Sequence, residues 1–152
     1  ELVSAVGAED VSTYLQSGNV LFRTSKKADE TRGAVERQIA DELGLEITVL
    51  IRTPRQLARI IDRNPFAKSK PETLHVTFLA AAPKGARAGG LDPPSVAPDE
   101  FHVSGAHVYL HCPNGYGRSK LSNTFFERRL GVAATTRNWN TVTQLAELAR
   151  RL

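Results

Sequence analysis

Helix-like and strand-like spacings of apolar residues alternate along the 152-residue chain. Residues 29–43 repeat apolar positions at helical spacing, which predicts an amphipathic helix that Gly44 ends. Its inward side chains are expected to be Val35, Ile39 and Leu43. A shorter helical tail is predicted for residues 1–7, with Gly7 as its stop.

Three segments have the composition of β-strands. Residues 13–23 are interpreted as one strand with Tyr14, Val20 and Phe22 on one face. Ser17-Gly18-Asn19 interrupts it, and a glycine inside a strand indicates a bulge or a close approach of backbone or ligand. The β-branched segment 46–52 predicts a second strand, and residues 74–81 predict a third.

A hairpin is predicted for residues 100–112. Gly105-Ala106 is a two-residue loop with glycine first, as a type II′ turn prefers, and it pairs Ser104 with His107. Alternation then gives an apolar and a polar face. The apolar face holds Phe101, Val103, Val108, Leu110 and Cys112, and the polar face holds Glu100, His102, His107, Tyr109 and His111.

Three more helices are predicted from their caps. Thr53 followed by Pro54 begins a helix that ends near Arg63. Ser119 is expected to cap a helix that runs to Leu130 and stops at Gly131. Its inward side chains would be Leu121, Phe125, Phe126 and Leu130. A last helix is expected from a Thr141 cap to Leu152. This order of elements predicts an α+β fold, a mixed sheet with packed helices.

Composition narrows the class of protein. The chain is 41% hydrophobic and 24% charged, as ordinary globular proteins are, and no apolar run approaches the roughly 20 residues of a membrane helix. No membrane partner is therefore expected. A single cysteine, Cys112, favours a reducing, cytoplasmic setting. The absence of methionine and the start at Glu1 indicate that a further segment precedes this sequence.

Positive charge is concentrated in the last quarter of the chain. Residues 1–111 carry 13 Lys/Arg against 14 Asp/Glu, whereas residues 112–152 carry seven against two, a net charge of +5. Such asymmetry favours an anionic partner, a small molecule or a nucleic acid. The alternative is a solvated helical surface without a ligand.

The same quarter contains the glycine loop Asn114-Gly115-Tyr116-Gly117-Arg118-Ser119-Lys120. Its spacing matches neither the Walker loop nor the dinucleotide fingerprint. Convergent backbone amides, a following helix and two cations would still suit an anion. The alternative is a simple connection from strand to helix, capped by Ser119.

A second polar cluster covers residues 135–141. Arg137 and Trp139, the single tryptophan, could grip a phosphate or stack on a base. The alternative is a turn between two helices pinned by a buried Trp139.

Three histidines on the hairpin lack the tight spacing of metal ligands, so no metal is expected. Parity predicts that Cys112 is a buried structural thiol.

Three segments resemble a bacterial family catalogued as domain of unknown function 1697. They are residues 13–22, 111–123 and 134–148, and the similarity spans essentially the whole chain. The resemblance implies ferredoxin-like units and no established activity or cofactor. The chain length predicts one compact domain over residues 1–152. Two ferredoxin-like subdomains, about 1–82 and 99–152, joined by the Gly/Pro/Ala-rich loop 83–98, are the alternative. The resemblance also implies that a strand and a glycine-rich segment precede Glu1.

The motifs of the resemblance lead to a hypothesis of one site. They are short and polar or glycine-rich, as ligand-binding loops are. They comprise Ser17, Gly18 and Asn19, then Asn114, Gly115, Gly117, Arg118, Ser119 and Lys120, then Thr136, Arg137, Asn138 and Trp139. We expect them to form a cleft for a phosphorylated or otherwise anionic ligand, nucleotide-like or nucleic acid. An enzyme acting on a phosphoryl or acyl group and a structural domain without a small ligand are the alternatives.

Overall fold

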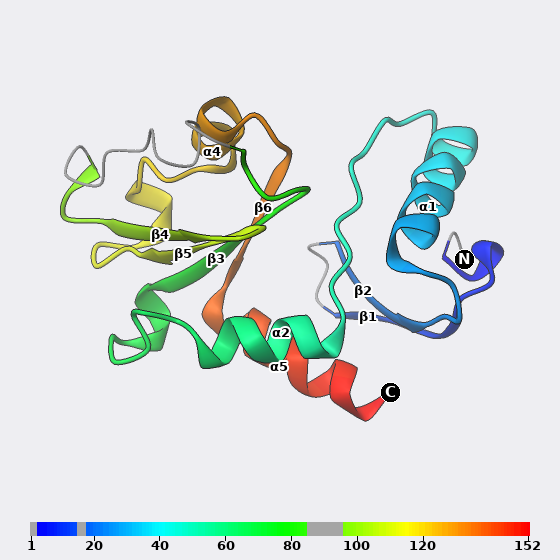
Figure 1. Cartoon of the computed structure of the whole chain (residues 1–152), viewed down its shortest axis with the longest axis horizontal. Coiled ribbons are helices and arrows are strands. Elements are labelled where there is room, and N and C mark those ends of the chain that lie inside the picture. The colour runs from blue at the N-terminus through cyan, green and yellow to red at the C-terminus, as the bar shows by residue number, and fades with distance from the viewer. Residues whose placement is uncertain (1–2, 15–17, 85–95) are drawn as a thin grey trace. The chain divides into compact units, whose positions relative to one another are not determined.

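The computed structural model describes residues 3–14, 18–84 and 96–152, which form two compact units (Figure 1). One unit, here the N-terminal unit, combines Glu1–Arg59 with Gln144–Leu152, and the other, the sheet unit, is Ile60–Thr143. Both boundaries fall inside helices, α2 (Pro54–Asp62) and α5 (Trp139–Arg151).

The N-terminal unit contains a 3-10 turn, η1 (Ser4–Val6), the strands β1 (Glu9–Tyr14) and β2 (Asn19–Arg23), and the helix α1 (Ala28–Leu43). The strands pair antiparallel. The prediction of one interrupted strand was therefore wrong: the chain turns back, and Gly18 adopts a left-handed φ of 82° before β2. Leu21 is buried whereas Val20 is 41% exposed, so the buried face of β2 is the one that Val20 does not share.

The helix α1 confirms the predicted amphipathic helix and its end at Gly44, which has a left-handed φ of 65°. Val35 is buried, but Leu43 is 56% exposed, because it lies in the last turn beyond the packed face.

The strand predicted for residues 46–52 does not form. Strand preference is realised only where a neighbouring strand offers hydrogen bonds and packing. Here the Val49 amide donates instead to Glu36 Oε1 at 3.0 Å, and Ile47 is 48% exposed.

The predicted start of α2 is confirmed. The Gln56 amide donates to Thr53 Oγ1 at 3.2 Å, and the Thr53 amide donates to Gln56 Oε1 at 2.8 Å. This reciprocal pair is a capping box, which satisfies two amide groups at the helix start.

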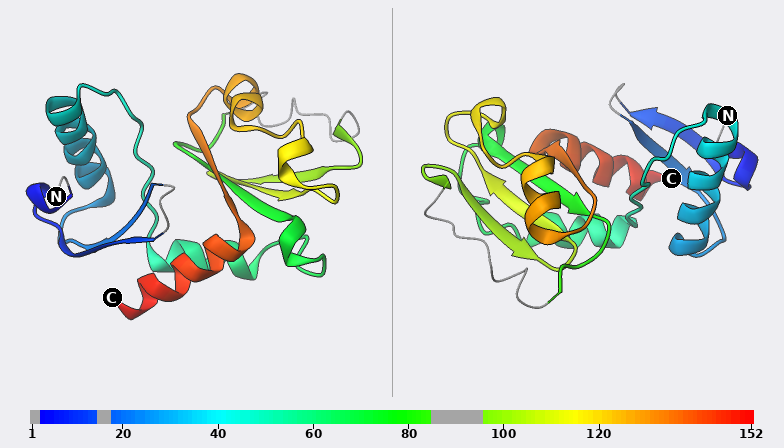
Figure 2. Two further views of the ribbon diagram at one scale, coloured as in Figure 1. Left: turned by 180° about the vertical axis from the view of Figure 1, so that it is seen from behind. Right: turned by 90° about the horizontal axis from the view of Figure 1, so that it is seen from above.

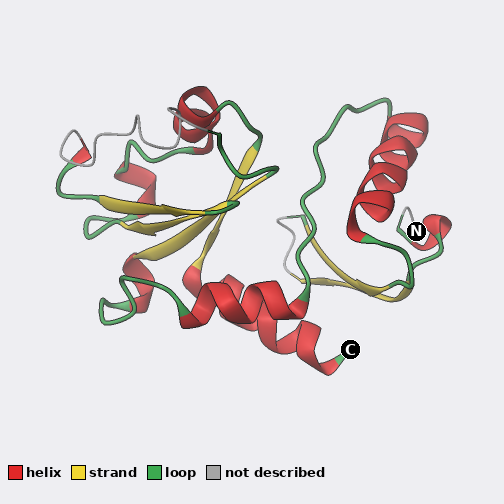
Figure 3. Ribbon diagram, viewed as in Figure 1, coloured by secondary structure: helices red, strands yellow, loops and turns green. Residues whose placement is uncertain are grey.

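The sheet unit is built on four antiparallel strands in the order β4-β5-β3-β6 (Figure 3). These are β3 (Leu74–Leu79), β4 (Glu100–Ser104), β5 (His107–His111) and β6 (Ala134–Asn138), with 3-10 turns η2 (Pro71–Thr73) and η4 (Tyr116–Arg118) and helix α4 (Asn123–Leu130). Because β5 and β6 flank β3 and α4 connects them, they form a split β-α-β unit, as in ferredoxin-like folds. The α+β prediction is confirmed, although the described sheets are antiparallel and not mixed.

The predicted hairpin and its register are confirmed. Ser104 pairs with His107 and Phe101 with Leu110, across a turn in which Gly105 has a φ of 57°. A residue with a side chain adopts this conformation only at a cost. The register therefore follows from the turn chemistry alone.

One face of this sheet packs against α4 (Figure 2). Its core combines residues of the strands and of α4 with residues of the segments that precede β4 and α4: Leu79, Val96, Val108, Leu110, Cys112, Leu121, Phe126 and Leu130. Phe126 is fully buried and meets Phe101 edge to face at 5.8 Å. Of the four residues predicted inward on this helix, Phe125 is half-buried and the other three are buried.

The predicted polar face of the hairpin is partly buried. Tyr109 is 1% exposed, and its hydroxyl donates to the carbonyl of Ile60 at 2.8 Å. Phe66 stacks on His111 beside it. The end of α2 and the following loop thus cover part of a face that alternation had assigned to solvent.

The segment 134–138 is a strand and not the predicted turn between helices. All five residues of β6 pair with β3, from Leu79 with Ala134 to His75 with Asn138. The edge of β3 supplies hydrogen-bond partners to this segment. Its polar sequence alone does not predict that pairing.

Replacing Phe126 tests this core. Phe126→Ala should lower the free energy of unfolding of the sheet unit by about 3–5 kcal/mol, because a fully buried ring leaves a cavity. Urea unfolding followed by the fluorescence of Trp139 measures it. Phe125→Ala, at the half-buried neighbour, is the matched control and should cost about 1–2 kcal/mol. Equal losses would contradict the assignment of Phe126 to the core.

Candidate functional site

The glycine loop leaves β5 and turns before α4. The Cys112 amide donates to the Thr73 carbonyl at 2.8 Å, and the Gly115 amide donates to the Cys112 carbonyl at 3.0 Å. Gly115 has a φ of 92° and ψ of 150°, a backbone conformation that strains any residue with a Cβ. The 3-10 turn η4 then carries Arg118.

The predicted cap of the following helix was wrong. Ser122 caps α4, since its hydroxyl accepts from the Phe125 amide at 3.1 Å. Ser119 ends η4 instead, and its hydroxyl accepts from the Leu121 amide at 3.0 Å. Two serines three residues apart offer the same local signal, and the buried position of Leu121 decides between them. Lys120 therefore precedes α4 and does not lie in its first turn.

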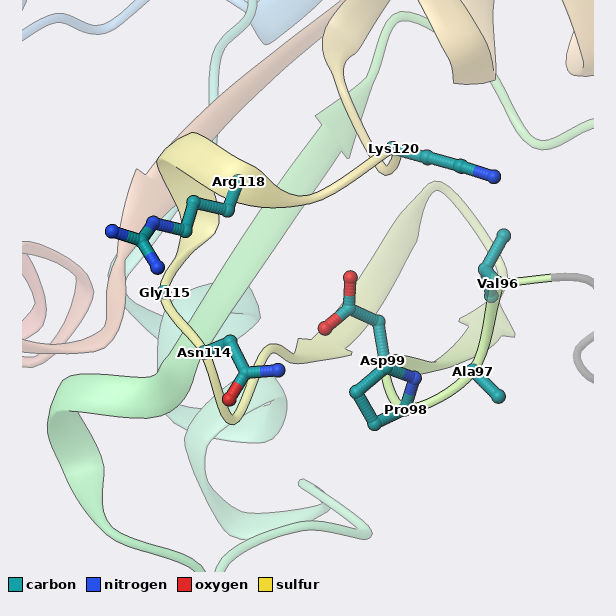
Figure 4. Close-up of a pocket in the computed structure, with 8 residues that line it drawn as sticks. All are labelled: Val96, Ala97, Pro98, Asp99, Asn114, Gly115, Arg118 and Lys120. Carbon is teal, nitrogen blue, oxygen red and sulfur yellow. The ribbon is translucent and has the colours of Figure 1, made fainter.

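A pocket of about 210 Å³ lies between this loop and the segment that leads into β4 (Figure 4). The loop contributes Asn114, Gly115, Arg118 and Lys120, and the other wall is Val96, Ala97, Pro98 and Asp99. In Figure 4 the Asp99 carboxylate lies between Asn114 and Lys120, while Arg118 reaches outward. All eight residues belong to the sheet unit.

The pocket carries two cations and one carboxylate. Arg118 and Lys120 are exposed, and neither forms an ion pair within the described residues. Asp99 is half-buried and likewise has no ion-pair partner in that part of the chain. The local charge is therefore net positive, with cations on long side chains that can rotate over the opening.

The aromatic ring of the glycine loop faces the sheet. Tyr116 stacks on His75 of β3, with ring centroids 4.7 Å apart and planes 25° apart. Burial lowers the pKa of His75. Its Nδ1 is buried and has no hydrogen-bond partner among the described residues. A neutral imidazole thus holds the loop against the sheet.

The residues of the second polar cluster mainly serve the fold. The Thr136 hydroxyl donates to Asn123 Oδ1 at 2.6 Å and lies 2.7 Å from the Thr77 hydroxyl. Asn138 Oδ1 accepts from the Thr141 amide at 2.8 Å, so Asn138 and not Thr141 caps α5. Trp139, in the first turn of α5, is half-buried, whereas the alternative interpretation of this cluster had it buried.

Arg137 lies on the face opposite the glycine loop. It pairs with Val76, and Val76 pairs with Tyr109, whereas Tyr116 stacks on His75 of the other face. Its guanidinium donates to Thr135 Oγ1 at 2.7 Å and to the Thr136 carbonyl at 2.9 Å. Burial lowers its pKa. Register therefore keeps Arg137 out of the pocket that Lys120 lines.

Four of the predicted site residues line the pocket: Asn114, Gly115, Arg118 and Lys120. Gly117 and Ser119 lie in the same loop but not in the lining. Ser17 lies outside the described residues, and Gly18 and Asn19 belong to the N-terminal unit, with Asn19 9% exposed.

Asp99 was missed by sequence reasoning. It follows a Gly/Pro/Ala-rich stretch that resembles a linker, and it is charged where a strand begins. The available signal was its position in the loop directly before the predicted hairpin, because binding residues concentrate in loops that a rigid scaffold positions.

The single cysteine lies in the core cluster of the sheet unit. Cys112 is fully buried on the apolar face, which confirms the predicted buried thiol. Burial raises its pKa, the hydrogen bond from Ser119 lowers it, and the negative charge of Asp99 raises it further. No group of three potential metal ligands occurs among the residues that the structure describes.

The chain belongs to a family of proteins of unknown function, DUF1697, whose model matches residues 1–109. The match ends before the glycine loop, so the lining of the pocket falls on both sides of its limit. No curated protein and no solved structure matches the chain. None of the described helices combines the length and the apolar character needed to span a bilayer.

Burial of Cys112 predicts a thiol that is inert in the folded protein. Its reaction with an aromatic disulfide reagent should be at least about a hundredfold slower in the native state than in denaturant, because the thiolate is disfavoured and shielded. Absorbance of the released thiolate follows the reaction. Comparable rates in both states would contradict the burial.

The lowered pKa of His75 predicts a pH dependence of stability. Between the ordinary pKa of about 6.5 and its lower folded value, the unfolded chain binds a proton that the folded chain does not. The free energy of unfolding should therefore fall as the pH drops below about 6.5. His75→Gln should remove this part of the slope in urea titrations from pH 5 to 8, whereas His102→Gln, at an exposed position, should retain it.

Proposed function

We propose that the sheet unit binds a small anionic ligand, a phosphate ester or a carboxylate, in the pocket between Val96–Asp99 and Asn114–Lys120. The observation that carries this proposal is the pair of exposed cations, Arg118 and Lys120, at a pocket where neither has an ion-pair partner among the described residues. Charge-assisted hydrogen bonds from such groups to an anion are about twice as strong as neutral ones.

The remaining groups at the pocket support recognition of an anion. The Asn114 side chain supplies amide donors at the lining. Gly115 lets the main chain lie close to a ligand, because nothing within 4 Å would meet a side chain there and its φ disfavours one. An anion could thus contact a cation, an amide and the bare main chain together.

The volume of the pocket favours a compact ligand. About 210 Å³ is below the roughly 300–1,000 Å³ of pockets for drug-sized molecules. A phosphorylated or carboxylated metabolite of a few carbons suits it better than a whole nucleotide. A nucleic acid would contact a broader surface, with the pocket cations as part of it.

A calorimetric titration with glycerol 3-phosphate tests the proposal. Arg118→Ala and Lys120→Ala should each raise Kd about three- to tenfold, and the double variant should raise it further, because each loses one charge-assisted contact. Lys68→Ala and Arg128→Ala remove exposed cations of the same unit outside the pocket, and they should leave Kd unchanged.

A thermal-shift panel of phosphate esters, dicarboxylates and short RNAs extends this test. If no anion raises Tm, or if the four variants respond alike, the proposal fails. Salt separates a small ligand from a nucleic acid. Raising salt from 50 to 200 mM should weaken a small anion only a few fold, whereas six to ten phosphate contacts would lose about 10³–10⁵ in affinity. A bacterial, cytoplasmic setting, expected from the sequence, stays a prediction.

A further inference from the structure

The carboxylate of Asp99 would repel a simple anion bound in this pocket. It lines the pocket together with Arg118 and Lys120, yet no ion pair within the described residues neutralises it. A bare anion bound beside it would meet a like charge at short range. An ionised carboxylate accepts hydrogen bonds and donates none, so it can contact such a ligand favourably only through a donor on the ligand.

The protein fixes the position of this carboxylate. The Asp99 amide donates to the Val96 carbonyl at 3.0 Å, and Val96 is 5% exposed within the core cluster. The strand β4 begins at the next residue, Glu100, and pairs along its length with β5. The backbone of Asp99 is thus held between a buried anchor and a paired strand, whereas the cations opposite are exposed.

Figure 4 shows the arrangement that follows. The Asp99 carboxylate lies between Asn114 and Lys120, while the Arg118 side chain points away from it. A ligand whose anionic group contacts Lys120 therefore presents its next few atoms to Asp99. The small volume of the pocket, about 210 Å³, keeps those atoms close to the anionic group.

We infer that Asp99 determines specificity: the ligand carries a hydroxyl or ammonium group close to its anionic group, and Asp99 accepts a hydrogen bond from it. This inference rests on the proposed anion pocket and names its ligand class. Phosphorylated amino alcohols, hydroxyalkyl phosphates and amino acids belong to that class. Alkyl phosphates without a donor do not.

Three probes of nearly equal size test the inference: ethyl phosphate, 2-hydroxyethyl phosphate and phosphoethanolamine. Titrations at pH 7.5 keep the phosphate mostly dianionic, since its second pKa is about 6. The wild-type protein should bind the two donor-bearing esters at least about fivefold more tightly than ethyl phosphate. Asp99→Asn should reduce this preference, weakening phosphoethanolamine and strengthening ethyl phosphate, because it removes the charge although it keeps an acceptor oxygen.

Glu100→Gln is the matched control. It removes one negative charge at the next residue, whose carboxylate contacts His111 at 3.1 Å and does not line the pocket. It should retain the wild-type preference. Asp99→Ala provides a second variant should Asp99→Asn fold poorly, and it should lose the preference.

The outcomes separate this inference from the proposed function. Equal binding of the three probes by the wild-type protein, with weaker binding in Arg118→Ala, overturns the role of Asp99 and leaves the anion pocket standing. Loss of preference in Glu100→Gln as large as in Asp99→Asn also overturns it, because net charge alone would then explain the effect. If none of the three probes binds and no anion raises Tm, both the role of Asp99 and the anion pocket are overturned.

Discussion

The pairing of β3 with strands on both of its edges is the constraint on which the sheet unit depends. Buried backbone groups need hydrogen-bond partners, and β3 finds them in β5 on one side and β6 on the other. Its residues Val76, Thr77 and Leu79 have no exposed surface. Because side chains alternate along each strand, this pairing also assigns every residue of β5 and β6 to a face. It places Arg137 on one face and the support of the glycine loop, His75, on the other.

The walls of the pocket are anchored in the core, whereas its two cationic side chains, Arg118 and Lys120, are exposed. Both of its walls are anchored in the same core cluster, one through Val96 and the other through Cys112 and Leu121, which flank the glycine loop. The stack of Tyr116 on His75 adds a further attachment. Groups held in this way keep their positions when a ligand arrives, which lowers the cost of ordering them. Arg118 and Lys120 are exposed, so in the proposed site they would adjust to ligands of different shape, and the fixed groups would carry the selectivity.

Family membership adds no chemistry to this picture, since the family itself is described only as of unknown function. The proposed function rests instead on the pocket, and the sequence predicts half of its lining. It identified Asn114, Gly115, Arg118 and Lys120, because glycines and cations in one short loop have a local signature. It could not find Asp99, which reaches the loop only because β4 pairs beside β5. Nor could it separate Arg137 from Lys120, since the faces of β6 exist only once β6 has joined the sheet.

The sequence by itself determined the helix ends and the hairpin turn, because these depend only on a few adjacent residues. The end of α1 at Gly44, the capping box of Thr53 and Gln56, and the register of the hairpin at Gly105 all follow from a few adjacent residues. Tertiary structure decided the rest. Residues 46–52 have the composition of a strand and form none, whereas the polar residues 134–138 become one. The physical reason is that a strand is stabilised by hydrogen bonds to another strand, and only the fold determines which segments have an edge to pair with.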